Sequence, residues 1–102
     1  EDVINHKPFP DAYNLARKLS KQSNESCIVI EDSCIGVDAA KAANLKCLMT
    51  LPPWSKCLKS INKKADACVD SLGNTERNSK LVFGKPLINN IVDLAYLRLI
   101  IN

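Results

Sequence analysis

Two short apolar runs separated by an alanine-rich segment constrain the fold of this chain more than any other feature. The runs are Cys27–Ile30 and Lys46–Thr50, and the segment Val37–Ala43 lies between them. An uninterrupted β-branched run is typical of a strand covered on both faces, and alanine favours helix. Two strands joined by one such helix form a parallel βαβ unit. We therefore predict an α/β fold with a parallel sheet and flanking helices, in which Cys27–Ile30 is a central strand.

Capping and breaking residues place the other elements around this unit. Asn44 suits the left-handed position that ends a helix, and the paired prolines of Leu51–Trp54 exclude helix and resist sheet pairing. The helix Ile88–Ile101 is apolar nearly all round, so it needs a partner surface. The remaining expected elements are an amphipathic helix over residues 10–22, a basic helix Ser55–Lys63, a last edge strand Ala65–Asp70 and a polar loop Thr75–Lys80.

Length, composition and charge exclude several classes of protein. The chain has 102 residues, of which 46% are hydrophobic and 25% charged, as in one small globular domain rather than a disordered segment. The net charge is +3, but the clustered lysines between Lys56 and Lys64 are interrupted by Leu58 and Ile61. That spacing favours the solvated face of a helix over a nucleic-acid stripe. We therefore do not expect nucleic acid as a partner. The apolar runs are too short to span a bilayer, so we do not expect a membrane as a partner either.

The cysteines indicate the cellular compartment of the protein, and the first residues indicate whether this chain is a whole protein. The five cysteines are an odd number and none are spaced two residues apart, which argues against a disulfide scaffold or a zinc knuckle. We therefore expect a reducing interior, the cytoplasm or an organelle stroma, and not secretion. The chain begins with Glu1 and lacks the basic start and apolar run of a secretory signal. It reads as part of a longer protein.

The most informative site is the acidic pair Glu31-Asp32, which directly follows the first apolar run. In open parallel sheets, ligands bind in the crevice outside the carboxyl ends of the strands. Carboxylate oxygens there suit Mg²⁺. Consecutive strand residues point to opposite faces, so we favour Asp32 as the direct ligand, with Glu31 reaching the ion directly or through water. The alternative is a solvated pair of loop residues.

A lysine near the start of the chain is the second candidate. Pro8 holds Lys7 away from helical backbone, so Lys7 projects from an extended loop just before a helix. Such a lysine can reach a phosphoryl oxygen as a compact positive charge. Taken alone, the motif fits a solvent-exposed loop lysine better than a catalytic one.

Together these motifs resemble those of a known superfamily. His6–Tyr13, followed about twenty residues later by Val29–Ala43, closely resembles the third and fourth motifs of the haloacid dehalogenase superfamily, most of all its β-phosphoglucomutase-like (CbbY-like) branch. The resemblance covers about residues 1–72. One departure is Asn44, where the family usually has glycine, and asparagine tolerates the same backbone conformation.

The resemblance implies a Rossmann-like core and a Mg²⁺-dependent phosphatase or phosphomutase. In that family an aspartate attacks a small phosphorylated metabolite, here expected to be a sugar phosphate, and forms an aspartyl-phosphate. By carry-over, Lys7 would be the catalytic lysine, Asp32 and Glu31 would hold Mg²⁺, and Ser33 would brace the acidic loop. No other cofactor is implied.

One family motif is missing from this sequence. The nucleophile lies in an Asp-x-Asp motif, and no Asp-x-Asp occurs in residues 1–102. We therefore expect residues 1–102 to be the C-terminal portion of the core domain, with the nucleophile strand and the cap in an upstream part of the same protein. The alternative is a free-standing, catalytically silent α/β module that binds a cation, a phosphate or a partner protein.

Overall fold

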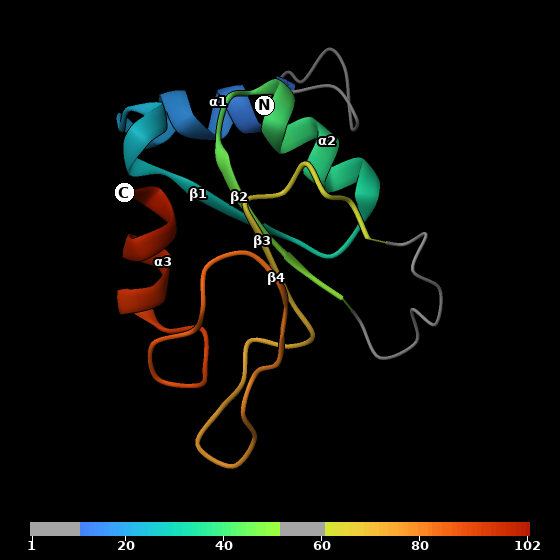
Figure 1. Cartoon of the computed structure of the whole chain (residues 1–102). Coiled ribbons are helices and arrows are strands. Elements are labelled where there is room, and N and C mark those ends of the chain that lie inside the picture. The colour runs from blue at the N-terminus through green and yellow to red at the C-terminus, as the bar shows by residue number, and fades with distance from the viewer. Residues whose placement is uncertain (1–10, 52–60) are drawn as a thin grey trace.

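The structure is a computed structural model that describes residues 11–51 and 61–102 (Figure 1). Short helices surround one sheet in these residues. In chain order the elements are α1 (Asp11–Ser20), the 3-10 turn η1 (Asn24–Ser26), β1 (Ile28–Glu31), α2 (Cys34–Ala42), β2 (Lys46–Thr50), β3 (Ala67–Val69), β4 (Leu81–Phe83) and α3 (Leu94–Ile101).

The four strands form one sheet in the order β1-β2-β3-β4. β1, β2 and β3 are parallel, with Ile28 opposite Lys46 and Leu48 opposite Ala67. This confirms the α/β fold, the parallel βαβ unit and the flanking helices. The prediction that the first strand is central is wrong for the described residues, because β1 lies at the edge of this sheet and Ile30 is 43% exposed.

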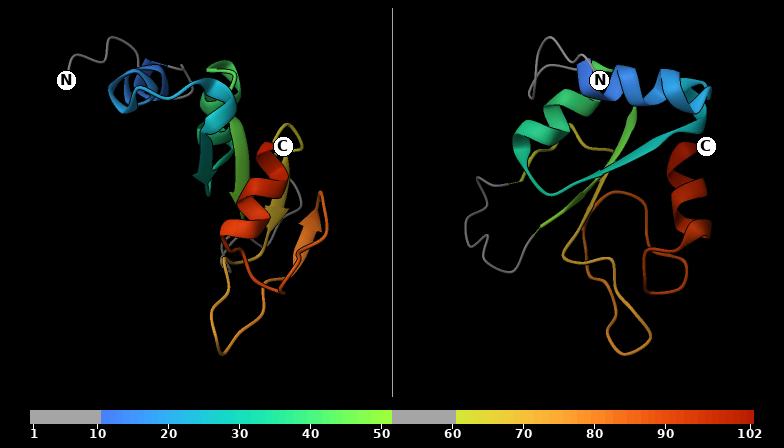
Figure 2. Two further views of the ribbon diagram at one scale, coloured as in Figure 1. Left: turned by 90° about the vertical axis from the view of Figure 1, so that its left-hand side faces the viewer. Right: turned by 180° about the vertical axis from the view of Figure 1, so that it is seen from behind.

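The sheet has an apolar core on each face. Cys47, Met49 and Cys68 pack with Val37 and Ala40 of α2, and Tyr13 of α1 packs against this cluster. On the other face, Leu48, Ala67 and Val69 pack with Tyr96 and Ile100 of α3. Because neighbouring strand residues point to opposite faces, α1 and α2 cover one face and α3 the other. Figure 2 shows α1 and α2 together and α3 apart from them.

Helix α2 ends as predicted but begins earlier. Asn44 has a φ of 60°, the left-handed conformation that the sequence predicted at the helix end. The helix begins at Cys34 rather than at Val37, because the Ser33 side chain caps it by accepting a hydrogen bond from the Gly36 amide. The chain is therefore helical from Cys34 onward, directly after the extended Ser33 cap.

The sequence analysis predicted that the third strand is the last strand of the sheet. In the structure, a fourth strand follows it. β4 pairs with β3 in the antiparallel direction, so β3 lies inside the sheet. The loop between them contains the predicted polar segment. Asn74 Oδ1 accepts hydrogen bonds from the Glu76 and Arg77 amides, each at 2.8 Å, and Asp70 Oδ1 accepts one from the Lys80 amide at 2.7 Å. These bonds turn the chain back beside β3.

Helix α3 is shorter than the predicted Ile88–Ile101. It begins at Leu94, because Asp93 caps it through a hydrogen bond from the Tyr96 amide to Asp93 Oδ1 at 2.9 Å. Before the cap, Asn90 has a left-handed φ of 64°, and the Val92 amide donates to the Leu72 carbonyl. Residues 88–93 therefore run as a connection against the loop that follows β3, not as helix.

Several sequence predictions lie wholly or partly outside the described residues. These are the basic helix Ser55–Lys63, most of the loop Leu51–Trp54, and Cys57. The last three residues of the predicted basic helix, residues 61–63, are described and are not helical. In the described part of the chain, the other four cysteines form no disulfide. No helix described in residues 11–51 and 61–102 is long and apolar enough to cross a membrane.

Candidate functional site

The acidic pair lies at the carboxyl end of the parallel strands. Glu31 is the last residue of β1, opposite Met49 of β2, and Asp32 follows in the turn that leads into α2. The structure therefore places both acidic residues at the carboxyl end of the parallel strands, where ligands bind in this class of fold. Asp32 is exposed, whereas Glu31 is half-buried.

The Glu31 side chain lies against the first turn of α2. A Cβ atom at Gly36 would overlap Oε1 and Cδ of Glu31, so the carboxylate lies directly over this glycine, and a larger residue would require the flexible Glu31 side chain to move. Gly36 itself is buried. The sequence analysis did not single out Gly36, although a glycine in the first turn of a helix, where alanine would be favoured, is a signal of close approach.

Ser33 joins the acidic pair to the helix. Its Oγ accepts a hydrogen bond from the Gly36 amide at 3.0 Å, and its carbonyl accepts one from the Val37 amide at 3.0 Å. These two bonds fix the backbone immediately after Asp32. The structure thus brings Glu31, Asp32 and Ser33 together in one turn. Lys7 lies outside the described residues, and its role remains a prediction.

The donor atoms at this turn fit part of a Mg²⁺ site. Carboxylate oxygens are hard ligands, and Mg²⁺ commonly takes one or two of them while keeping several waters. In the residues that the structure describes, no group of three or more His, Cys, Asp or Glu side chains is placed to hold a metal ion. Glu31 and Asp32 thus supply carboxylate oxygens at this end of the sheet, and a Mg²⁺ site here would need further oxygen ligands.

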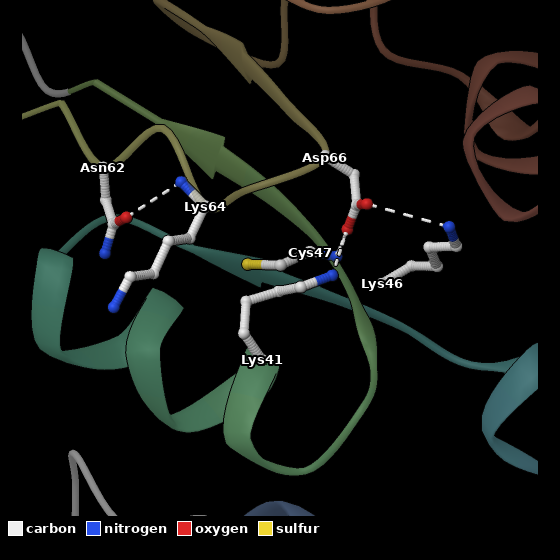
Figure 3. A network of polar contacts seen from close by, with 6 residues as sticks. All are labelled: Lys41, Lys46, Cys47, Asn62, Lys64 and Asp66. Carbon is white, nitrogen blue, oxygen red and sulfur yellow. Dashed lines mark hydrogen bonds and ion pairs between the residues drawn. The ribbon is translucent and has the colours of Figure 1, made fainter.

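A second polar network lies at the amino end of the strands (Figure 3). Asp66, directly before β3, accepts hydrogen bonds at 2.8 Å from Lys41 Nζ of α2 and from the Cys47 amide of β2. Lys46 Nζ lies 3.7 Å from the other carboxylate oxygen. Burial alone would raise the pKa of Asp66, but these hydrogen bonds and positive charges outweigh it and lower the pKa below 3.8. The network ties α2 to β2 and β3.

We expect Asp66→Asn to destabilise the protein in a pH-dependent way. An asparagine cannot pair with Lys41 as an ion, so the free energy of unfolding at pH 7 should fall by about 1–3 kcal/mol. Because the folded-state pKa lies below the unfolded value of 3.8, the wild-type advantage is present above pH 3.8. It is lost as the pH falls through the folded-state pKa. Urea unfolding of both proteins across this range measures the difference.

Comparisons with known proteins identify the family. A sequence profile described as "Haloacid dehalogenase-like hydrolase" matches residues 1–50. The "CBBY-like protein" of Arabidopsis thaliana is 40% identical over 74 residues, 72% of this chain. The chain belongs to the haloacid dehalogenase superfamily. Its similarity to the CbbY-like protein places it with the CbbY-like branch, as the motifs predicted.

Two further relatives of this haloacid dehalogenase member come from the same plant. "Protein SUPPRESSOR OF QUENCHING 1, chloroplastic" is 35% identical over 88 residues, or 84% of the chain. The "Bifunctional riboflavin kinase/FMN phosphatase" is 38% identical over 72 residues, or 71% of the chain. These matches span 8% and 18% of the two relatives, and the match to the CbbY-like protein spans 23% of that protein. The chain therefore corresponds to a small part of each relative.

Proposed function

We propose that the full-length protein is a Mg²⁺-dependent phosphatase or phosphomutase that acts on a small phosphorylated substrate, such as a sugar phosphate. The observation that carries this proposal is the carboxylate pair Glu31 and Asp32 at the carboxyl end of a parallel strand, in a haloacid dehalogenase family member. The name of one relative includes an FMN phosphatase, which supports a phosphate monoester as the substrate class.

Each residue of the turn has a distinct part in the proposed site. The half-buried Glu31 carboxylate lies over Gly36 and would reach the ion directly or through water, while the exposed Asp32 carboxylate is the direct metal ligand. Bound Mg²⁺ would supply positive charge that neutralises phosphoryl oxygens. Lys7 would contact the same oxygens, and Ser33 would hold the turn.

The nucleophile of the proposed reaction comes from a part of the protein outside this chain. An aspartate there would attack the phosphorus of the monoester, breaking its P–O bond and releasing the alcohol of the substrate. The resulting aspartyl-phosphate would then transfer its phosphoryl group to water or to a sugar hydroxyl and free the aspartate. Glu31 and Asp32 would position the metal for that step, and they would not themselves form the covalent bond. In this proposal the upstream segment is the essential partner of residues 1–102.

We expect Asp32→Asn in the full-length protein to weaken Mg²⁺ binding more than Lys7→Ala does. The first change removes a charged oxygen ligand, whereas the second removes only a charge near the phosphate. The affinity should fall at least tenfold for Asp32→Asn and by less than threefold for Lys7→Ala, on the scale of roughly 10–100-fold seen when even indirect metal-site residues are changed. Calorimetric titration with Mg²⁺ measures both.

The matched control is Glu76→Gln, which also replaces a carboxylate by an amide but lies in the exposed loop between β3 and β4. It should leave Mg²⁺ affinity unchanged. Equal or reversed effects of Asp32→Asn and Lys7→Ala would contradict Asp32 as the direct ligand. A full-length protein that binds Mg²⁺ or phosphate but never turns over a monoester would favour the silent binding module instead.

A further inference from the structure

Asn62 connects the segment before β3 to the first turn of α2. Its Nδ2 donates one hydrogen bond to the Cys34 carbonyl at 3.2 Å and one to Asp38 Oδ1 at 2.8 Å. Its Oδ1 accepts from the Lys64 amide at 3.0 Å, a contact that Figure 3 also shows. The side chain therefore uses both of its amide hydrogens and its oxygen.

Three contacts of Asn62 are with residues of α2 and β2, and another, from the Lys64 amide, lies in its own turn. Its backbone amide contacts Met49 Sδ at 3.4 Å, and Met49 is a buried residue of β2. Cys34 and Asp38 lie in α2, one turn apart, so two bonds from one side chain hold that turn from the outside. Only a side chain with two donors and one acceptor in this geometry can make all three bonds.

The helical turn that Asn62 holds comes directly after the acidic pair and its Ser33 cap. Cys34 follows Ser33 directly and lies two residues after Asp32, and Gly36, against which Glu31 packs, belongs to the same turn. A shift of this turn would therefore move the Ser33 cap and the surface that supports Glu31.

We infer that Asn62 is a positioning residue that holds the first turn of α2, and with it the Glu31-Asp32 turn, in the geometry needed for the metal. This inference rests on the proposed function and adds to it a residue 30 positions further along the chain. No sequence motif marks Asn62, because its partners are distant in sequence.

The sharpest test replaces Asn62 by its isostere aspartate in the full-length protein. In Asn62→Asp both donors are lost, and a carboxylate faces the Cys34 carbonyl and the Asp38 carboxylate, which repel it. The Lys64 amide keeps its acceptor. Asn62→Ala removes the same donors without adding charge, so it gives a second measurement should the aspartate variant fail to fold.

Two readouts separate positioning from general stability. Hydrogen exchange of the peptide covering Asp32–Gly36 should be faster in Asn62→Asp, while exchange in β2 and β3 should stay unchanged. Mg²⁺ affinity by calorimetry should fall about tenfold, the lower end of the range of roughly 10–100-fold found for residues that orient metal ligands. Asn62→Ala should show both effects to a smaller extent.

Two further variants serve as controls. Asn74→Asp makes the same chemical change in a loop where the side-chain oxygen is an acceptor only, so exchange and affinity should both remain as in the wild type. The double variant Asn62→Asp with Asp38→Asn exchanges amide and carboxylate across one hydrogen bond and should recover part of the lost affinity.

The outcomes distinguish this inference from the proposed function. Unchanged hydrogen exchange at Asp32–Gly36 in both Asn62 variants would overturn the inference, regardless of their Mg²⁺ affinity. Faster exchange with unchanged Mg²⁺ affinity, in a protein where Asp32→Asn does weaken binding, would also overturn it and leave Asn62 a purely structural residue. If the wild type binds no Mg²⁺, the proposed function fails, and the inference that rests on it fails as well.

Discussion

Purified residues 1–102 are expected to show no Mg²⁺-dependent turnover of a phosphate monoester. The carboxylates of the candidate site are assigned to the metal, and the sequence contains no Asp-x-Asp motif that could supply the nucleophile. Loss of one member of a catalytic unit typically lowers the rate by several powers of ten. A phosphate-release assay with a sugar phosphate, at saturating Mg²⁺, should therefore give a rate indistinguishable from the buffer.

The control for this experiment is the full-length protein under identical conditions, which should turn over the substrate. Circular dichroism of the purified chain must show helix and strand, so that missing activity is not simply missing structure. Measurable Mg²⁺-dependent turnover by residues 1–102 would contradict the assignment of the nucleophile to another part of the protein.

We expect Tyr96→Ala to be among the most destabilising single substitutions in this domain. Tyr96 is the largest fully buried side chain in the described residues and packs with Leu48, Ala67 and Val69. Its hydroxyl donates a hydrogen bond to the Lys85 carbonyl at 2.6 Å. Truncation would leave a cavity beneath the sheet and remove that bond, which costs about 3–5 kcal/mol of unfolding free energy. Urea unfolding of the full-length protein measures this.

The same helix provides the matched control. Leu94 is 61% exposed, so Leu94→Ala should change the unfolding free energy by less than about 0.5 kcal/mol. Tyr96→Phe keeps the ring and loses only the hydroxyl, and it should cost about 1 kcal/mol. Similar costs for Tyr96→Ala and Leu94→Ala would show that α3 does not pack against the sheet as described.

Local sequence patterns predicted the βαβ unit well because its determinants are local. The second strand was predicted as Lys46–Thr50 and lies there, since this short apolar run is bounded by Asn44 and by the prolines after Leu51. The left-handed conformation of Asn44 follows from its own side chain. The acidic pair could be placed at the carboxyl end of β1 for the same reason, because it directly follows an unambiguous strand.

Elements determined by distant contacts could not be predicted. Leu81–Phe83 is only three residues long and becomes a strand because Asp70 and Asn74 fold the intervening loop back onto β3. At the C-terminus, the apolar residues that begin at Ile88 led to a predicted helix start six residues too early, because the pattern does not show that Asp93 caps the helix. In the polar networks near and away from the site, the contacts of Asn62 with α2 and of Asp66 with Lys41 join residues 24–28 positions apart, and no spacing rule links them.

The thiols of β2 and β3 give this sheet a built-in chemical reporter. Burial, with a smaller effect from the nearby Glu31 charge, raises the pKa of Cys47 to about 12, and burial raises the pKa of Cys68 to about 11. Both side chains are fully shielded from solvent, and alkylating reagents attack thiolates rather than thiols. Modification at these two positions thus requires the helices packed over them to move away from the sheet first. Their labelling kinetics therefore measure how often this face of the sheet becomes exposed, without any substitution in the protein.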